Sequence, residues 1–474
     1  MPEHFTKRAG AVPILILLML VSLAAPQLIG RLSETIGVDF YNFWGVPVAL
    51  RLTDHTLGSP YTNGQRYHAV LKEFAATANQ PKLRSASRFW SGPDFTGSPL
   101  LYWVFTLVSS DYTFSLGVFQ ALQILSFLGA CLLVGSLHRW NPFALLCLAL
   151  LCLLIYQPLL SDLRVGNLGC WQLVVLAGVM GLASALPRVS SFAPRAGLGA
   201  LLLVVLVALT LCKPNIALIG ALLAVHLGVR HGARVLAVAA LAAAVATALL
   251  LLVPCLYFGS FTVWQEWYRF VYGGNPAMLV RPVANGNYAT ALLLASWLGV
   301  SVAMVAGVLL VLLGLSLAFV IFWRNESLTP VPRTAREALR AGVRRVFDDH
   351  RPPLAIAILV TAAASPLYWV HYYVLLLIPS LWLLTGAASR FVPTLAATGV
   401  LMSGGMVGML LWACGWPGAM PASIALSWVP LWGALLISLR SSDAAAPRTA
   451  TIAGDSRSTI GHAARAPRSR RRKK

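Results

Sequence analysis

Few side chains of this sequence are able to do chemistry, and the first is a carboxylate just after an apolar run. Asp39 lies in the segment VDFYNFWG (38–45), nine residues after the uncharged run 11–30. A carboxylate among apolar side chains can act as a general base, because burial raises its pKa toward neutral pH. An aspartate in such a place also serves as the N-cap of a following helix, which is the commoner role. The residues alone leave both interpretations open.

Basic side chains and one histidine also lie near the ends of later apolar runs. They are Arg164, Lys213, Arg281 and His371. Cations in such places either extend to lipid headgroups or bind the phosphate of an anionic lipid. The histidine follows a Ser-Pro pair (365–366) by about one and a half helical turns. A lone histidine in an apolar helix is usually a hydrogen-bonded structural residue, but its place beside a helix break makes a functional role equally reasonable.

Composition places these residues in a membrane protein. Of the 474 residues, 58 % are apolar and 11 % are charged, whereas soluble domains have about 45–50 % and about 25 %. The apolar residues come in blocks of about 20, the length that crosses a bilayer core. A soluble enzyme, a secreted disulfide scaffold and a disordered chain are therefore excluded.

The net charge of +21 first suggests nucleic acid as a partner. Its distribution argues against this, because seven of the basic residues form a tail at 465–474, after the last apolar run. Such a tail fixes the orientation of a membrane protein or contacts anionic lipids. We therefore expect membrane lipids, and not nucleic acid, as partners.

The cysteines and histidines do not predict a metal site. The seven cysteines lie in or beside apolar runs, no CxxC pair and no HExxH motif occurs, and the nine histidines are scattered. The pair Asp348–Asp349 lies in a basic loop and is typical of a solvated surface. We expect neither a metal ion nor another cofactor.

Twelve apolar runs predict an all-α polytopic membrane protein. The runs are 12–30, 113–137, 142–160, 168–186, 197–212, 214–229, 234–258, 297–323, 353–364, 367–386, 391–414 and 423–440. Two runs end at a proline, at Lys213–Pro214 and at Ser365–Pro366. Proline lacks the amide donor, so each place is a broken helix or a tight hairpin. Irregular backbone at membrane depth is tolerated only beside protein or water, so both breaks predict a cavity.

The basic residues orient these spans. If both termini are cytoplasmic, 25 of the 36 Lys and Arg residues fall on the cytoplasmic side and 11 on the other, as the positive-inside rule requires. The chain is then one transmembrane domain (1–440) with external loops at 31–112 and 259–296. A basic cytoplasmic loop at 324–352 and a disordered basic tail at 441–474 complete it.

The first external loop is more than a linker. Within 64–78, apolar residues recur on one face of a predicted helix, namely Tyr67, Val70, Leu71, Phe74 and Ala78. This pattern predicts an amphipathic helix lying along the membrane surface. The run 98–108 is apolar but too short to cross a bilayer, and we expect it to dip into the interface.

The sequence resembles glycosyltransferase family 87, which belongs to the GT-C superfamily of membrane glycosyltransferases that use polyprenyl-phosphate sugars. The resembling segments are VDFYNFW (38–44), SPLL (98–101), VGNLGCWQL (165–173), LCKPNIAL (211–218), NGNYATA (285–291) and SPLYWVHYY (365–373). The family tends to have Tyr-Pro-Pro-Leu, Gly-Gln-x-Asn, Lys-Pro, an Asn-rich stretch and Ser-Pro-x-x-Trp-x-His at the last five of these places. Their order along the chain matches the family's order.

The resemblance implies a GT-C-like fold and an inverting, metal-independent sugar transfer. A mannose or arabinofuranose residue would pass from a polyprenyl-phosphate donor to a glycolipid or glycan acceptor, outside a bacterial inner membrane. Asp39 matches the family's catalytic base, and His371 matches a histidine that meets the donor phosphate. The supporting cations would be Arg164, Lys213 and Arg281, and the substrate-lining residues would be Tyr41, Asn167, Asn287 and Trp369.

Two other classes of function fit part of the pattern. A transporter or flippase for a lipid-linked or anionic substrate also uses broken spans and intramembrane cations. Transporters usually have internal repeats with short loops, whereas this chain has no visible repeat and a large first loop that contains Asp39. A non-catalytic scaffold would leave Lys213, Arg281 and His371 without a purpose. The enzyme is therefore the favoured hypothesis.

Overall fold

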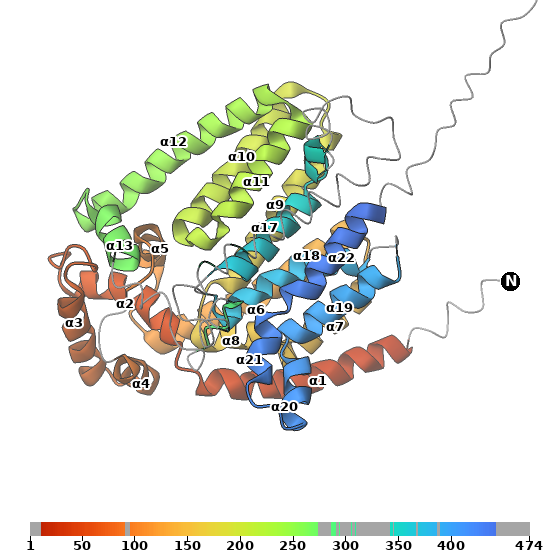
Figure 1. The fold of residues 1–474 in the computed structure, drawn as a ribbon. Helices are drawn as coiled ribbons and strands as arrows, with labels where there is room; N and C mark the ends of the chain where they lie inside the picture. Colours follow the sequence, from red (N-terminus) through yellow and green to blue (C-terminus); the bar gives the residue numbers. More distant parts are fainter. Residues whose placement is uncertain are drawn as a thin grey trace, which may run out of the picture.

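The computed structural model is built from helices. It describes residues 11–90, 95–273, 286–290, 293, 305, 309, 342–344, 346–365, 368–385 and 389–441. All named elements in this part are helical, apart from one isolated β-bridge, so the all-α prediction is confirmed. Figure 1 shows long helices side by side in a bundle, with α2 to α5 and α13 gathered at one end.

Six helices in the described part are long and apolar enough to cross a membrane. They are α1 (Ala11–Glu34), α6 (Tyr112–Leu137), α9 (Gly169–Ala185), α10 (Phe192–Cys212), α12 (Ala233–Phe258) and the α21–α22 segment (α21 Ala419–Ala425, α22 Trp428–Ser441). Two bent pairs bring the number to as many as eight, since α7 (Pro142–Ile155) and α8 (Gln157–Val165) meet at 63° and α19 (Phe391–Ser403) and α20 (Met406–Ala413) at 68°. The chain is thus a membrane protein with several apolar helices.

The remaining predicted spans either correspond to shorter helices or lie almost entirely outside the described residues. Three correspond to the shorter elements α11 (Ala217–His231), α17 (Arg351–Ala364), and η7 (Val370–Leu376) with α18 (Leu377–Leu384). Almost all of the run 297–323 lies outside the described residues, as do most of the basic loop 324–352 and the tail after 441. The helix α17 is buried along nearly its whole length, so its apolar character reflects protein packing on all sides.

The first predicted break is a tight hairpin. Lys213 is extended between α10 and η3 (Pro214–Ile216), the short turn that begins α11. Leu206 of α10 lies beside Gly220 of α11, and Leu227 lies beside Gly199, so the two helices run antiparallel. The proline therefore reverses the chain at this end of the bundle, where its missing amide donor costs nothing.

Three interrupted helices meet at Tyr156. This residue separates α7 from α8, and its hydroxyl bonds to the carbonyl oxygen of Tyr373 and to Ser403 Oγ, both at 3.1 Å. Tyr373 lies in η7, after the predicted break at Ser365, and Ser403 ends α19. The backbone N–H of Gln157 also donates to Gly404, at 3.4 Å. The irregular backbone is thus satisfied by other protein groups, as an apolar setting requires.

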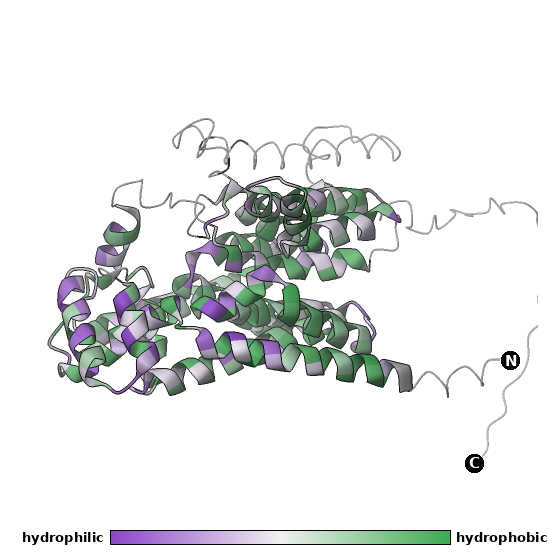
Figure 2. Cartoon of the chain, turned by 90° about the horizontal axis from the view of Figure 1, so that it is seen from below, coloured by the Kyte–Doolittle hydropathy of each residue, from purple (hydrophilic) through white to green (hydrophobic). Residues whose placement is uncertain are grey.

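The segment between α1 and α6 forms a compact group of helices, here called the loop-one unit. Its elements are α2 (Val38–Leu52), α3 (Gly64–Thr77), α4 (Pro81–Phe89), α5 (Pro99–Val104) and η1 (Phe105–Leu107). The helix α2 is its centre, since every side chain from Phe40 to Leu50 is buried. Figure 2 shows that hydrophilic residues gather in this unit, while the bundle helices are mostly hydrophobic.

The predicted amphipathic helix at 64–78 is confirmed as α3, but its apolar face does not point to lipid. Tyr67, Leu71 and Ala75 are buried in the core that α3 shares with α2. The spacing of apolar residues predicts that this face is buried, but it does not distinguish burial against protein from burial in a membrane. Here other parts of the protein bury it. By contrast, Trp103, Val104 and Leu107 of the short 98–108 segment are exposed, and Leu107 is 94 % exposed.

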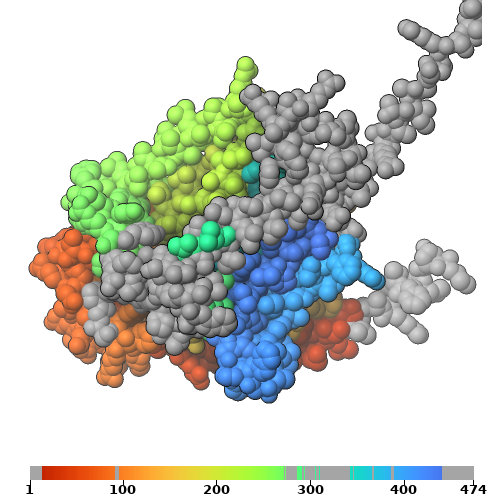
Figure 3. Space-filling view, viewed as in Figure 1, coloured from red at the N-terminus to blue at the C-terminus, as the bar shows by residue number. Residues whose placement is uncertain are grey.

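A second exposed apolar feature is the helical hairpin of α20 and α21. The two short helices pack on each other, and Trp412 and Trp416 near their turn are about two-thirds exposed. In Figure 3 this segment forms a rounded blue projection at the lower edge of the molecule.

Candidate active site

Asp39 lies in the first turn of α2 and is half-buried. The N-cap is Gly37, whose backbone is left-handed at φ 65°, and no side chain caps the helix there. The N-cap interpretation of Asp39 is therefore wrong. Its carboxylate Oδ2 instead accepts a hydrogen bond of 2.6 Å from the Nδ2 of Asn167, 128 residues further along the chain.

Asn167 lies in the short connection between α8 and α9 and is 4 % exposed. Its Oδ1 accepts a hydrogen bond of 2.7 Å from the N–H of Leu168, and its own carbonyl accepts one of 2.7 Å from Gln123 Nε2. The connection begins at Gly166, which is left-handed at φ 70°; a methyl group there would lie 2.6 Å from Phe40 Cβ. Only glycine lets this turn pack so closely on α2, and this brings Asn167 to Asp39.

A buried carboxylate, Asp162, anchors the start of α9. It is 0 % exposed and accepts hydrogen bonds of 2.9 Å from the N–H groups of Gly169 and Cys170. Gln123 Nε2 donates to the same carboxylate at 3.1 Å. The free N–H groups of a helix start favour a negative charge, so Asp162 stabilises this end. No local sequence pattern singles out Asp162, since its hydrogen-bond donors come from α6 and from residues seven and eight positions further along the chain.

His371 is packed against the start of α9. It is 3 % exposed, and a methyl group on Gly169 would lie 3.0 Å from its carbonyl oxygen. The imidazole stacks on Trp369 with centroids 6.4 Å apart and meets the edge of Tyr372 at 4.5 Å. Among the described residues no hydrogen-bond partner reaches its Nε2. A buried polar atom without a partner calls for a ligand or a water.

Lys213, at the hairpin between α10 and α11, lies between η7 and α2. Its Nζ donates to the hydroxyl of Tyr372 at 3.3 Å. It also lies 5.5 Å from the ring centroids of both Phe43 and Tyr372. Aromatic faces attract a cation without cancelling its charge. Phe43 follows Asp39 by one helical turn, so the ammonium group lies on the side of α2 that also carries the carboxylate.

These contacts, together with short steps along the chain, link four segments that are distant in sequence, and the linked set is here called the ring. In order, its members are Asp39, Asn167, Gly169, His371, Tyr372, Lys213 and Phe43. The steps from Asn167 to Gly169 and from Phe43 back to Asp39 run along the chain. The ring joins α2, the start of α9, η7 and the α10–α11 hairpin. It contains a carboxylate, an imidazole and a cation, which are three of the groups that the sequence singled out.

Asn287 and Trp369 position the chain that leads to His371. They face each other in the isolated β-bridge, and Asn287 Oδ1 accepts a hydrogen bond of 2.9 Å from the N–H of Tyr368. Asn287 is fully buried, whereas Trp369 is half-buried. Trp369 is also the residue on which the His371 ring stacks.

The other predicted site residues lie apart from the ring contacts. Arg164 is exposed in the last turn of α8. Tyr41 is buried in the loop-one unit against Trp44 and Tyr112, and burial raises the pKa of its hydroxyl above the ordinary value. Arg281 lies outside the described residues.

An amide pair that the sequence did not single out lies beside the ring. Gln172, in the first turn of α9, donates from Nε2 to Asn215 Oδ1 at 3.1 Å, and Asn215 lies two residues after Lys213. Gln172 Oε1 and Asn215 Nδ2 are buried, and neither has a partner among the described residues. The two residues belong to the VGNLGCWQL and LCKPNIAL segments, so only the packing of α9 on the hairpin reveals the pair.

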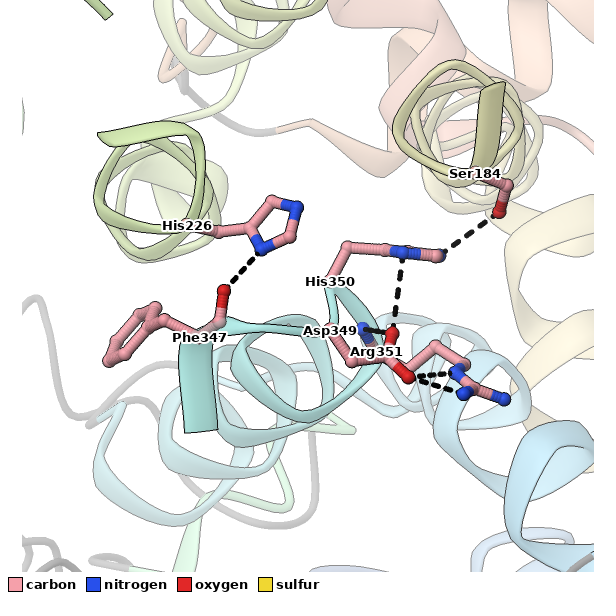
Figure 4. A network of polar contacts seen from close by, with 6 residues as sticks. All are labelled: Ser184, His226, Phe347, Asp349, His350 and Arg351. Atoms are coloured by element: carbon pink, nitrogen blue, oxygen red, sulfur yellow. Dashed lines mark hydrogen bonds and ion pairs between the residues drawn. The ribbon is translucent and has the colours of Figure 1, made fainter. Parts of the chain in front are cut away.

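A second polar cluster lies at the other end of α6 and α9. Its members line a cavity of about 340 Å³ together with Leu137 and Ser184, which lie near the ends of these helices; they are His226, Arg230, Asp348, Asp349, His350 and Arg351. In Figure 4, His226 Nδ1 bonds to the carbonyl of Phe347 at 2.7 Å, and His350 Nε2 lies 3.2 Å from Ser184 Oγ. Gly169 and Ser184 are fifteen residues apart, so about 20 Å of helix separates the two clusters.

The charges of this second cluster neutralise each other. Arg230 pairs with Asp348 at 2.7 Å, and Arg351 pairs with Asp349. Burial raises the pKa of Asp349, but the hydrogen bonds and charge of Arg351 outweigh it and lower the pKa overall. Burial lowers the pKa of His350 to about 4. Both aspartates are therefore ion-paired. Asp348 is exposed, as predicted for a solvated surface, whereas Asp349 is half-buried.

Comparison with known proteins adds no family. No protein-family model, no curated protein and no solved structure matches this chain. Within the described residues, no group of three or more His, Cys, Asp or Glu side chains is placed to hold a metal ion.

Proposed function

We propose that this protein is an inverting membrane glycosyltransferase, as its resemblance to glycosyltransferase family 87 implies. It would move a mannose- or arabinofuranose-class sugar from a polyprenyl-phosphate donor to a hydroxyl of a glycolipid or glycan acceptor. The observation that supports this is the ring, which includes the Asp39 carboxylate, the Lys213 ammonium and the His371 imidazole among its members. A base and a phosphate-binding group on one ring are what this transfer needs.

In the proposed reaction, Asp39 takes the proton of the acceptor hydroxyl while that oxygen attacks the anomeric carbon. The bond from this carbon to the phosphate oxygen breaks, and its electron pair leaves with the polyprenyl phosphate. Attack from the face opposite the leaving group inverts the configuration. A phosphate is a weak base, so the leaving oxygen needs no strong general acid.

The cation and the imidazole act on the leaving phosphate. Negative charge grows on it in the transition state, and the Lys213 ammonium stabilises that charge together with a hydrogen bond donated by His371 Nε2. Such fixed groups contribute most where water is excluded, and His371 is 3 % exposed. Arg164 and Arg281 are supporting cations in the same proposal.

The proposed location is a bacterial inner membrane, with both termini cytoplasmic and the loop-one unit outside. The basis is the distribution of the basic residues, with 25 on the proposed cytoplasmic side and 11 on the other. A GT-C-like arrangement of about twelve spans in one domain (1–440) belongs to the same proposal. The acceptor then approaches from outside the cell, and the polyprenyl chain lies in the bilayer.

A transporter or flippase for a lipid-linked or anionic substrate is the second candidate. The interrupted helices that meet at Tyr156 favour it, because transporters bind substrates at such interruptions. The loop-one unit and the carboxylate on α2 favour the enzyme.

One experiment separates the two candidates. Purified protein in nanodiscs is given polyprenyl-phosphate mannose or arabinofuranose together with membrane-lipid acceptors, and glycolipid product and released polyprenyl phosphate are measured. The enzyme forms both in equal amounts in nanodiscs, where transport between compartments is impossible. Movement of the donor across proteoliposome membranes without any product would instead establish the transporter.

A further inference from the structure

The carboxylate of Asp39 accepts a short hydrogen bond from the amide of Asn167, at 2.6 Å. We propose that Asn167 is a positioning residue that aims Asp39 and keeps it ionised, and that Gln123 and Asp162 hold Asn167 in place. This inference rests on the proposed function, because it assigns Asn167 a role in the same reaction. Asn167 then acts on the substrate through Asp39.

The hydrogen bonds allow only one orientation of the Asn167 amide. Its Oδ1 accepts from the N–H of Leu168 at 2.7 Å, and its Nδ2 donates to Asp39 Oδ2 at 2.6 Å. A flipped amide would place its NH₂ group against the N–H of Leu168 and its oxygen against the carboxylate, and both contacts repel. The amide therefore always offers a donor to Asp39, and a donor stabilises the charged form of a carboxylate.

The backbone of Asn167 is fixed on both sides. Its N–H donates to the carbonyl of Asp162 at 3.2 Å, and its carbonyl accepts from Gln123 Nε2 at 2.7 Å. Gln123 is 0 % exposed, and its Nε2 faces three oxygens. They are the carbonyl oxygens of Asn167 and Asp162 and the carboxylate Oδ2 of Asp162. A flip of that amide would turn its oxygen toward all three. The Gln123 amide thus also has one stable orientation, and its support cannot be lost without burying unpaired polar groups.

The support is rigid because it belongs to the helix framework. Asp162 binds the N–H groups at the start of α9, and Gln123 projects from α6, which packs along α9. A base on the first turn of α2 is thus oriented by two bundle helices. Positions held in this way are the ones that preorganise a catalytic group.

The test measures both activity and the proton on Asp39. Asn167→Ala removes the amide that donates a hydrogen bond to Asp39. Asn141→Ala is the matched control, since Asn141 caps the start of α7 and is not part of the site. The first readout is transfer rate against pH at saturating donor and acceptor. The second is the infrared carboxyl band of Asp39, identified by its loss in Asp39→Asn and followed as the pH is lowered.

In Asn167→Ala, we expect the titration midpoint of Asp39 to move to higher pH by about one unit, because a hydrogen bond to a charged group is lost. The acid limb of the rate profile moves with it, and kcat at neutral pH falls by about 10- to 100-fold with little change in KM. Gln123→Leu moves both readouts in the same direction. Asn141→Ala leaves both unchanged.

An unchanged infrared midpoint in Asn167→Ala would overturn the proposal. If that variant does not fold, Asn167→Asp, which has nearly the same shape, replaces it; the two adjacent carboxylates should then retain one shared proton at higher pH than wild type. An Asp39 band unchanged from wild type in this variant overturns the proposal equally. The infrared readout needs no turnover, so it distinguishes failure of this proposal from failure of the proposed function. If the wild type transfers no sugar but the Asp39 midpoint is shifted in Asn167→Ala, only the proposed function is refuted.

Discussion

The two ends of α6 and α9 both carry buried histidines and charged side chains, but they treat charge differently. At the His350 end, each arginine of the cluster is matched by an aspartate, Arg230 by Asp348 and Arg351 by Asp349. At the Asp39 end, within the described residues, Lys213 contacts a hydroxyl and two aromatic rings and forms no ion pair with a carboxylate.

The difference separates a structural cluster from a site for a charged ligand. Arginines that are each paired with an aspartate leave no net charge at the ends of the packed helices. Such ion pairs add little net stability, about 0–1 kcal/mol each when exposed. A cation that is held by aromatic rings keeps its charge available for a phosphate. On His371, the imidazole Nε2 has no partner among the described residues, so it adds a hydrogen-bonding group to the same place.

The largest expected effect is a difference in labelling between the two ends, which we expect to lie on opposite sides of a membrane. Single cysteines are placed at the exposed Ser85, in α4, and at the exposed Ser190, between α9 and α10, in a protein without native cysteines. An impermeant thiol reagent should label Ser85→Cys in intact cells and Ser190→Cys only after the membrane is opened. Labelling of Ser190→Cys in intact cells would reverse the proposed orientation.

The next largest effect concerns the base. Asp39→Asn keeps the shape and the hydrogen-bond acceptor but cannot take a proton, so turnover should fall by about 10²–10⁴-fold with donor binding retained. The measurement is transfer in nanodiscs, together with a thermal melt to show that the fold is intact. Addition of EDTA to the wild type should change little.

Wild-type turnover by Asp39→Asn would remove this residue from the mechanism. The outer carboxylates to examine next would be Asp54, Asp94 and Glu266.

The comparison also predicts which cations matter for the donor. Lys213→Ala and His371→Ala should each weaken donor binding by about 10- to 100-fold, since each removes a charge-assisted or buried hydrogen bond to phosphate. Lys213→Arg should restore binding only in part, because the two cations differ in shape. The matched control is Arg230→Ala at the His350 end, which should leave the donor affinity unchanged.

Equal loss of donor affinity in Arg230→Ala and Lys213→Ala would contradict the division of roles between the two ends. The affinity is measured directly, by binding of a non-transferable donor analogue to purified protein.

The smallest expected effect is a pH dependence of stability at the His350 end. Burial lowers the pKa of His350 to about 4, with Asp349 partly opposing it, whereas an unfolded histidine titrates near 6.5. The unfolded chain therefore binds the proton first as the pH falls, so stability is complete above about 6.5 and declines toward pH 4, by roughly 1–3 kcal/mol for this residue. His350→Gln should make thermal melts less dependent on pH over this range.

That experiment sharpens the comparison because the pH effect should involve stability alone. Donor affinity of His350→Gln should equal that of the wild type. An unaltered pH slope of the melting temperature would show that His350 is not responsible, and His138, whose pKa burial lowers to about 4 as well, would be tested next.

The sequence by itself determined the features that depend on local chemistry. Apolar blocks of bilayer length predicted an all-helical membrane protein, prolines after Lys213 and Ser365 predicted the interruptions, and the spacing at 64–78 predicted α3. Each follows from the composition and order of neighbouring residues. A proline, for example, cannot donate a backbone hydrogen bond in any fold.

Only the tertiary structure decided the contacts between distant residues. Gly37, and not Asp39, is the N-cap of α2, because the chain turns through a left-handed residue against Leu116 and Tyr112. Similarly, α3 covers the loop-one core because apolar spacing specifies a buried face but not what buries it.

The partners of the site residues show this most clearly. Asn167 meets Asp39 across 128 residues, and Lys213 meets Tyr372 across 159. Asp162 had no local signal, since its donors lie on α6 and at the start of α9. Such pairs depend on how helices pack and on where a glycine permits close approach, and neither is encoded in the periodicity of a single segment.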